Sequence, residues 1–260
     1  MFFSDVSFTT RRSLALVISL LLLTPLASFA GESPRVVEAA YREGELISLI
    51  AVVAKAGDDA AAVRGQYLRN AFGLAERHGM KVLGSLNVTE VISGDFKPQA
   101  LAFYSWPSVA AEQAFDAIPE WKPIKATRPD GWDDLRFHDA TARDDLTLRF
   151  ASDKSYTLAT AWVNPENPDD YDNYLKGIEP ALNALGGRFV YQMRDPDFSA
   201  LVSTKSPPSR LTLVEWKSAE DLDLFLQSDE FKQHSALLTS GTVGFELVRL
   251  EVSAAAGSRS

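Results

Sequence analysis

Apolar and polar positions alternate along the chain in blocks that predict strands and helices in turn. Residues 46–54 are almost continuously apolar, which is typical of a buried strand. In residues 60–78 the apolar positions recur at steps of three and four, which predicts a helix that ends before Gly79. A further helix is expected to begin after Ser108, a candidate N-cap. Other strand-like segments of this half cover residues 80–92, 101–106 and 135–138.

The second half of the chain shows the same order of elements. Residues 171–185 carry apolar positions at helical spacing, with Pro180 as an expected kink or break. Ser218 is again a candidate N-cap, and residues 195–197 are expected to begin a loop. Strand-like segments cover residues 156–163, 188–193, 211–216 and 245–252. Each half therefore predicts the order β-α-β-β-α-β of a ferredoxin-like unit.

The two halves also share sequence motifs at a constant spacing. Trp106-Pro107-Ser108, Phe115, Glu120-Trp121-Lys122 and Gly131 are echoed 110 positions later by Trp216-Lys217-Ser218, Phe225, Glu230-Phe231-Lys232 and Gly241. A period of this length indicates one duplicated domain, because solenoid repeats are far shorter.

A single unit of this kind leaves one face of its sheet bare, and two units can bury those faces against each other. We therefore predict an α+β fold in which tandem ferredoxin-like β-α-β-β-α-β repeats pack sheet to sheet as an intramolecular α+β barrel. The repeats are expected at residues 45–140 and 155–251, with a linker at 141–154 and a disordered tail at 252–260. Such a chain would be a monomeric pseudo-dimer.

Residues 1–30 have the three-part pattern of a secretory signal peptide. Arg11 and Arg12 precede the apolar run of residues 14–23, and small residues follow Pro25 at the expected cleavage positions. The run is short for a membrane span, so a periplasmic or secreted protein without stable membrane insertion is expected after cleavage. An uncleaved N-terminal anchor is the alternative, and the twin-arginine route is an alternative to the ordinary export route.

Charge and composition exclude several classes of function. The chain carries a net charge of −9 and shows no basic stripe, which argues against nucleic-acid binding. It contains no Cys, so thiol catalysis and thiolate-bound metals are excluded. The three His residues are not spaced as a zinc site, and no metal is expected.

The second half resembles the dimeric α+β barrel superfamily. The resemblance rests on Asp169-Asp170-Tyr171-Asp172-Asn173-Tyr174-Leu175, Leu185-Gly186-Gly187-Arg188-Phe189, Arg210-Leu211-Thr212-Leu213-Val214-Glu215-Trp216 and Phe225-Leu226-Gln227-Ser228-Asp229-Glu230-Phe231. Within that superfamily it is similar to a family of small bacterial domains of unknown function. The resemblance implies two packed sheets and a cleft between sheet and helices in each repeat. The superfamily hosts cofactor-independent monooxygenases, haem-dependent enzymes, isomerases and stress-response proteins, and no catalytic motif of any of them is matched here.

Candidate site residues come mainly from the second repeat. Glu215 and Arg188 lie on strands expected to be adjacent, where such a pair is either structural or able to bind a carboxylate or phenolate. Lys81 and Ser105 stand at the corresponding places of the first repeat, so a site built on this pair would exist only once. His234 is the candidate general base. Candidate ligand-binding residues are Arg188, Tyr191, Arg194, Trp216 and His138.

Two hypotheses of function follow. The first is an exported protein that binds a small apolar or aromatic molecule, or a protein partner, without catalysis. The second is a cofactor-independent monooxygenase or isomerase acting on a small aromatic substrate, which needs a shaped apolar pocket with a few polar groups. A closed cleft filled with Phe and Leu favours binding, whereas an open pocket lined by His234, Arg188 and Glu215 favours catalysis. No cofactor is expected; haem bound through His138 or His234 is a less favoured alternative.

Overall fold

Both halves of the chain form the β-α-β-β-α-β unit in the computed structural model, which describes residues 33–202 and 204–252. The described elements all lie in one compact unit. The expected signal peptide lies outside the described residues, as does the expected tail beyond residue 252.

The first repeat follows the predicted order, with its second helical segment divided into short helices. Its elements are β2 (Leu46–Ala54), α1 (Asp58–Arg77), β3 (Lys81–Ser93), β4 (Ala100–Trp106), α2 (Val109–Asp116), α3 (Trp121–Ala126), α4 (Arg128–Gly131) and β5 (Trp132–Thr141). Ser108 caps α2 as expected, because its hydroxyl accepts a hydrogen bond from the backbone N–H of Ala111.

The second repeat differs from the prediction in two places. Its elements are β7 (Ser155–Val163), α5 (Asp170–Ala184), β8 (Arg188–Arg194), β9 (Asp197–Ala200), β10 (Arg210–Trp216), α6 (Ala219–Gln227), α7 (Asp229–Gly241) and β11 (Thr242–Val252). Helix α5 continues through Pro180 without a break. The loop expected at residues 195–197 is a sharp bend at Asp195, with φ of 45°, after which the chain resumes as β9.

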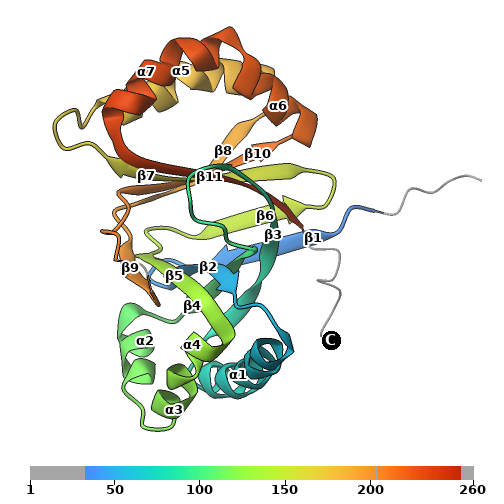
Figure 1. Cartoon of the computed structure of the whole chain (residues 1–260), viewed down its shortest axis with the longest axis vertical. Coiled ribbons are helices and arrows are strands. Elements are labelled where there is room, and N and C mark those ends of the chain that lie inside the picture. Colours follow the sequence, from blue (N-terminus) through green and yellow to red (C-terminus); the bar gives the residue numbers. More distant parts are fainter. Residues whose placement is uncertain (1–32, 203, 253–260) are drawn as a thin grey trace, which may run out of the picture. The chain divides into compact units, whose positions relative to one another are not determined.

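One nine-stranded antiparallel sheet joins the repeats in the order β8-β10-β7-β11-β3-β4-β2-β5-β9. Within each repeat the order is that of a ferredoxin-like unit, and the last strand of each pairs with a strand of the other: β11 with β3, and β5 with β9. Strands β8 and β9 stand at opposite ends of this order, yet only Asp195 and Pro196 separate them in the chain. The sheet therefore closes on itself, and the predicted intramolecular α+β barrel is confirmed (Figure 1).

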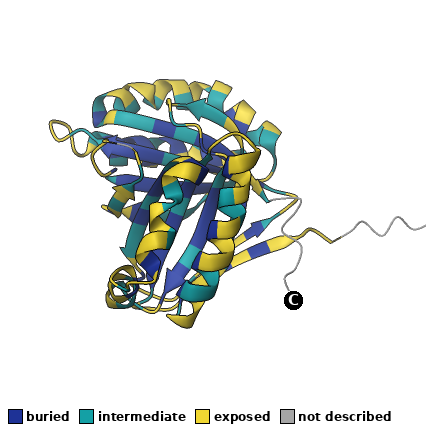
Figure 2. Ribbon diagram, turned by 60° about the horizontal axis from the view of Figure 1, so that its bottom comes forward, coloured by how far each residue is buried: buried dark blue, intermediate teal, exposed yellow. Residues whose placement is uncertain are grey.

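The barrel is filled by side chains from alternate positions of both repeats. Leu49 and Phe103 of the first repeat and Leu158 and Leu213 of the second belong to the same buried cluster. The residues between them point to the outer face, where helices cover the sheet. The helices of the two repeats lie on opposite sides of the barrel (Figure 1), with exposed outer faces and buried strands beneath (Figure 2).

A two-stranded ribbon, formed by β1 (Val36–Tyr41) and β6 (Leu146–Ala151), is an addition that the sequence pattern did not predict. Strand β6 lies within the expected linker, and β1 precedes the expected start of the first repeat. The ring of Phe150 lies 5.0 Å from the rings of both Phe103 and Tyr156. The connection between the repeats thus contributes to the core of the barrel.

Candidate functional site

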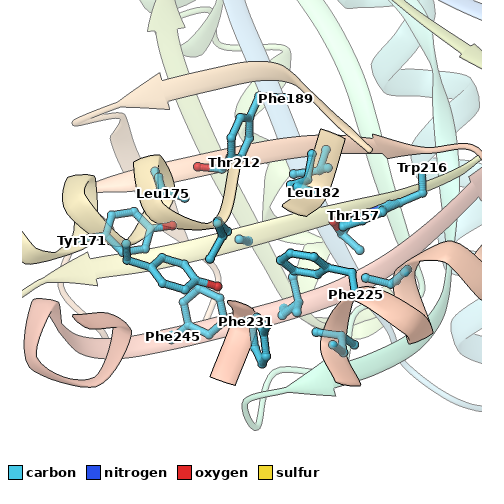
Figure 3. Close-up of a pocket in the computed structure, with 17 residues that line it drawn as sticks. Thr157, Tyr171, Leu175, Leu182, Phe189, Thr212, Trp216, Phe225, Phe231 and Phe245 are labelled. Atoms are coloured by element: carbon cyan, nitrogen blue, oxygen red, sulfur yellow. Dashed lines mark hydrogen bonds between the residues drawn. The ribbon is translucent and has the colours of Figure 1, made fainter. Parts of the chain in front are cut away.

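A pocket lies in the second repeat between the sheet and helices α5, α6 and the start of α7 (Figure 3). Its volume is about 60 Å³. The lining is overwhelmingly apolar and aromatic, and comprises Thr157, Ala159, Tyr171, Tyr174, Leu175, Ile178, Leu182, Phe189, Thr212, Val214, Trp216, Leu222, Phe225, Leu226, Phe231, Phe245 and Leu247.

Strand and helix periodicity place these side chains around the pocket. On β10, Leu211 and Leu213 point into the barrel, so Thr212, Val214 and Trp216 point toward the helices. On α5, the residues that face the sheet recur at steps of three and four, as the sequence predicts. These helix residues are Tyr171, Tyr174, Leu175, Ile178 and Leu182. The pocket is therefore a consequence of the two element faces and needs no special loop.

The deep part of the pocket is closed to solvent and its rim is partly open. Leu182 and Leu222 are almost fully buried, whereas Phe231 and Leu226 are only half-buried. An engineered apolar cavity of ~150 Å³ binds benzene or xenon, so a benzene-sized ring needs more room than this pocket offers at rest. Entry of such a ring would require outward movement of rim side chains.

The two ends of the pocket differ in their polar groups. At the end near Trp216 the Thr157 hydroxyl accepts a hydrogen bond of 3.1 Å from the indole N–H of that residue. The hydroxyls of Tyr171 and Thr212 lie at the end away from Trp216 (Figure 3), and neither makes a hydrogen bond of normal geometry with any described residue. Burial raises the pKa of Tyr171, and the neighbouring Thr212 hydroxyl offsets part of the rise. Both hydroxyls are thus neutral near pH 7.

A charged group lies directly behind this polar end. Arg210 precedes Thr212 by two positions on the same face of β10, and its guanidinium lies 5.7 Å from the centre of the Tyr171 ring. The Arg210 Nη1 donates to Asp172, and Arg194 lies 3.6 Å from the other oxygen of that carboxylate. Burial opposes ionisation of Asp172, but the hydrogen bond and charge of Arg210 bring its pKa below the usual value. The Arg210 Nε is buried and has no partner among the residues described.

The corresponding cleft of the first repeat is occupied by larger side chains. Strand pairing makes Ile50 the counterpart of Ala159 and Tyr104 the counterpart of Val214. Trp121 stands where the second repeat has Phe231, and its ring lies 4.8 Å from Phe115 and 6.0 Å from Tyr67. The first repeat therefore fills with its own aromatic rings the space that the second repeat leaves as a pocket.

A second, wider hollow of about 280 Å³ lies on the surface of the first repeat. It is lined by α1 and the α3–α4 segment, with polar groups from Gln66, Asn70, Thr127 and Asp130. None of its lining residues comes from the sheet, so it is not the cleft that the fold places between sheet and helices. The smaller, better enclosed pocket of the second repeat is the better candidate for a ligand site.

The expected pair of Glu215 and Arg188 is present, but it lies outside the pocket. The guanidinium donates two hydrogen bonds, of 2.9 and 3.0 Å, to the two carboxylate oxygens. Glu215 alternates with Trp216 on β10 and so points to the barrel side of the strand, while the Arg188 side chain is 60% exposed. The first repeat has Lys81 opposite Ser105 at the corresponding register, and Lys81 binds Glu45 instead, at 2.8 Å.

The other expected site residues are dispersed. Trp216 lines the pocket, Tyr191 packs against the barrel core, and Arg194 is held beside Asp172. His234 lies on α7 against Gly177 of α5 and does not line the pocket. His138 is 3% exposed on the barrel side of β5, with its ring 5.2 Å from Phe198. Burial lowers the pKa of His138 to about 4.

The pocket does not suit a haem group or a metal ion. No His lines it, and about 60 Å³ is far too little for a porphyrin. Over residues 33–202 and 204–252, no group of three His, Asp or Glu side chains is arranged to hold a metal ion. In the same part of the chain, no helix combines the length and apolarity that a membrane crossing requires.

The sequence reasoning missed Thr212 and Arg210 as site residues. A signal was present, because Arg210 and Thr212 alternate with Leu211 and Leu213 at the start of the strand. Their counterparts in the first repeat are Ala100 and Ala102, so the polar end of the pocket distinguishes the two copies.

Comparison with known proteins supports the fold, and one family model matches the second repeat. Residues 154–251 match the sequence model of a family described as Domain of unknown function (DUF1330). No curated protein sequence matches the chain. The structure of an anthrone oxidase-like protein is similar over 83% of this chain and 94% of its own, with a TM-score of 0.54 and 14% identity.

Two further solved structures are similar over different shares of the chain. A protein of unknown function from Rhodopseudomonas palustris covers 39% of this chain and 84% of its own, at 24% identity and a TM-score of 0.35. A chlorite dismutase variant from Candidatus Nitrospira defluvii covers 82% of this chain and 93% of its own, at 10% identity and a TM-score of 0.44. Together with the sheet order, the likeness to the anthrone oxidase-like protein identifies the dimeric α+β barrel fold expected from the sequence.

Proposed function

We propose that this protein binds a small, mainly apolar or aromatic molecule in the pocket of its second repeat. The observation that carries the proposal is the difference between the two clefts. Both repeats build the same fold, yet the first fills its cleft with Tyr104 and Trp121, whereas the second keeps a pocket of about 60 Å³. Leaving apolar side chains without contacts costs stability, which favours a ligand as the reason for the space.

Binding is better supported than catalysis. The pocket lining contains no His, Asp, Glu or Lys. Tyr171 and Tyr174 are its titratable members, and burial raises the pKa of both, so neither supplies a base near neutral pH. A cofactor-independent monooxygenase or isomerase on a small aromatic substrate is the alternative, and it would require a base or an activated substrate from outside this lining.

The place of action is also part of the proposal. The charged start, apolar run and small residues of positions 1–30 support export to the periplasm or beyond. A protein partner in place of a small ligand would have to cover the rim formed by Phe231 and Leu226. The enclosed shape of the pocket favours a small molecule.

The test is whether a molecule co-purifies with the protein and depends on the pocket. The variant Ala159→Ile places in the second repeat the side chain that Ile50 supplies in the first. We expect small molecules extracted from the purified wild-type protein to include one that mass spectrometry no longer detects in this variant.

The matched control is Ala151→Ile, which adds the same side chain to a half-buried strand position of β6, outside the pocket. The control should retain the molecule at the wild-type level. Absence of any bound molecule from the wild type, or equal retention by Ala159→Ile, would contradict the proposal.

A further inference from the structure

The unpartnered polar groups at one end of the pocket define the chemistry of the ligand. Tyr171 and Thr212 are each 1% exposed and Arg210 is 8% exposed, so all three are more than nine-tenths buried. The hydroxyls of Tyr171 and Thr212 lie beside each other in the pocket wall, but neither has a hydrogen-bond partner of normal geometry among the described residues. The Arg210 Nε, behind the wall, also has none. Because buried polar atoms are almost always paired, these groups call for an explanation.

A purely structural role does not explain them. The first repeat forms the same strand with Ala100 and Ala102 in place of Arg210 and Thr212. Arg64 stands at the counterpart of Tyr171, because Gly131 approaches Arg64 as Gly241 approaches Tyr171.

Guanidinium groups also lie at this end of the first cleft, but they are paired. Arg64 Nη1 donates to the carbonyl oxygens of Lys55 and Gly131, and Arg128 Nε donates to the Tyr67 hydroxyl at 2.8 Å. Buried polar groups without a partner among the described residues at this end distinguish the repeat that has the pocket.

Two cations share one carboxylate at this end. Arg210 and Arg194 both contact Asp172, and the Asp172 side chain is 37% exposed and thus shared with solvent. The Arg210 Nε is a donor only, while the two hydroxyls can donate or accept. Donors beside a buried guanidinium favour an oxygen that accepts hydrogen bonds.

We propose that the ligand is an aromatic molecule with an acceptor oxygen, such as a ketone, quinone or phenolate oxygen, which lies against Tyr171 and Thr212 with its apolar ring among the residues toward Trp216. This inference rests on the proposed binding function. It adds the orientation of the ligand and the class of group that the protein selects.

The test compares two probes of equal shape, acetophenone and α-methylstyrene, which differ in carrying C=O or C=CH₂. Calorimetric titration gives the affinity of each for the wild type and for Thr212→Val and Tyr171→Phe. The two probes differ in hydration, so the informative quantity is the change in their affinity ratio on mutation. At least one variant should bind acetophenone about three- to tenfold more weakly while the affinity for α-methylstyrene changes less than twofold.

The control is Thr157→Val, which removes a hydroxyl from the opposite end of the pocket and should leave the affinity ratio unchanged. Since Thr212→Val removes a hydroxyl without a partner, its melting temperature without ligand should equal or exceed that of the wild type. A lower melting temperature, or equal loss of affinity for both probes, would overturn the inference. Failure of both probes to bind the wild type would instead contradict the proposed function itself.

Discussion

At the scale of single residues, the buried carboxyl of Asp139 links stability to pH. It lies on β5, accepts a hydrogen bond from Ser48, and faces the helices of the first repeat. Burial raises its pKa to about 6, and the negative charges of Glu112 and Asp197 add to the rise. The folded protein therefore binds the Asp139 proton more tightly than the unfolded chain, in which the pKa of this carboxyl is near 3.8. Its contribution to stability is present at low pH and is lost as the pH rises toward 6.

We expect Asp139→Asn to remove this loss. We compare the free energy of unfolding of the variant with that of the wild type. From pH 4 to pH 7 this difference should shift by about 2 kcal/mol in favour of the variant, since each pKa unit corresponds to ~1.4 kcal/mol. Urea unfolding of both proteins at the two pH values measures the effect. A difference between them that does not change with pH would contradict the account.

The neighbouring His138 changes stability with pH in the opposite direction to Asp139. Because burial lowers its pKa to about 4, the folded protein binds this proton less tightly than the unfolded chain, and stability falls as the pH drops through this range. In the wild type the two neighbours therefore offset each other. The Asn variant keeps His138 and should show the His138 dependence more clearly, with stability that decreases on acidification.

Strand alternation in the sequence explains where some of the predicted site residues lie. Trp216 reaches the pocket because strand alternation places it there, and that alternation is visible in the sequence. The same alternation puts Glu215 on the other face, so the Arg188–Glu215 pair was correctly expected on neighbouring strands but not at the pocket. Thr212 alternates with leucines in the sequence, but that pattern alone does not show that its hydroxyl lacks a partner.

At the scale of elements, the contact between α5 and α7 depends on a glycine. A Cβ on Gly177 would lie 2.5 Å from two atoms of the His234 ring and 2.9 Å from its Cγ. Gly is normally unfavourable within a helix by ~1 kcal/mol relative to Ala. Its presence here is explained by the close approach of the imidazole, which indicates a packing role for His234.

We therefore expect Gly177→Ala to destabilise the protein by about 1–2 kcal/mol, although the same change stabilises most helices. In a His234→Ala background it should stabilise by up to about 1 kcal/mol, because the obstruction is gone. A double-mutant cycle by thermal unfolding measures the coupling. Equal effects of Gly177→Ala in both backgrounds would show that the two residues do not interact.

Elements with strong periodicity were predictable, and short or interrupted ones were not. Helices α1 and α5 have long apolar faces and were expected from sequence. Strands β1 and β6 alternate buried and exposed positions over only six residues each, with charged residues between the buried ones. Such a short alternation is easily taken for a charged linker, and its strand character depends on pairing between segments about 110 residues apart.

At the scale of the whole molecule, duplication explains why one chain contains a complete barrel. Each repeat supplies a sheet whose helices leave one apolar face bare, and that face fills the barrel. Closure through β11–β3 and β5–β9 pairs the strand edges that would otherwise be exposed. The internal repeat and the bare face made this architecture predictable from sequence. The sequence did not predict that one cleft is filled and the other keeps a pocket. This difference depends on how the side-chain volumes at positions such as Ile50 and Ala159 add up between the sheet and the helices.

The central claim concerns the described residues 33–202 and 204–252: the second repeat keeps an apolar pocket between its sheet and helices, where the first repeat packs aromatic side chains. It is tested most directly by the crystal structure of the protein under xenon pressure, since xenon enters apolar cavities without specific chemistry. We predict ordered xenon among Leu175, Ile178 and Val214, and none in the cleft of the first repeat beside Trp121. Xenon absent from the second repeat, or bound equally in both clefts, would contradict the account.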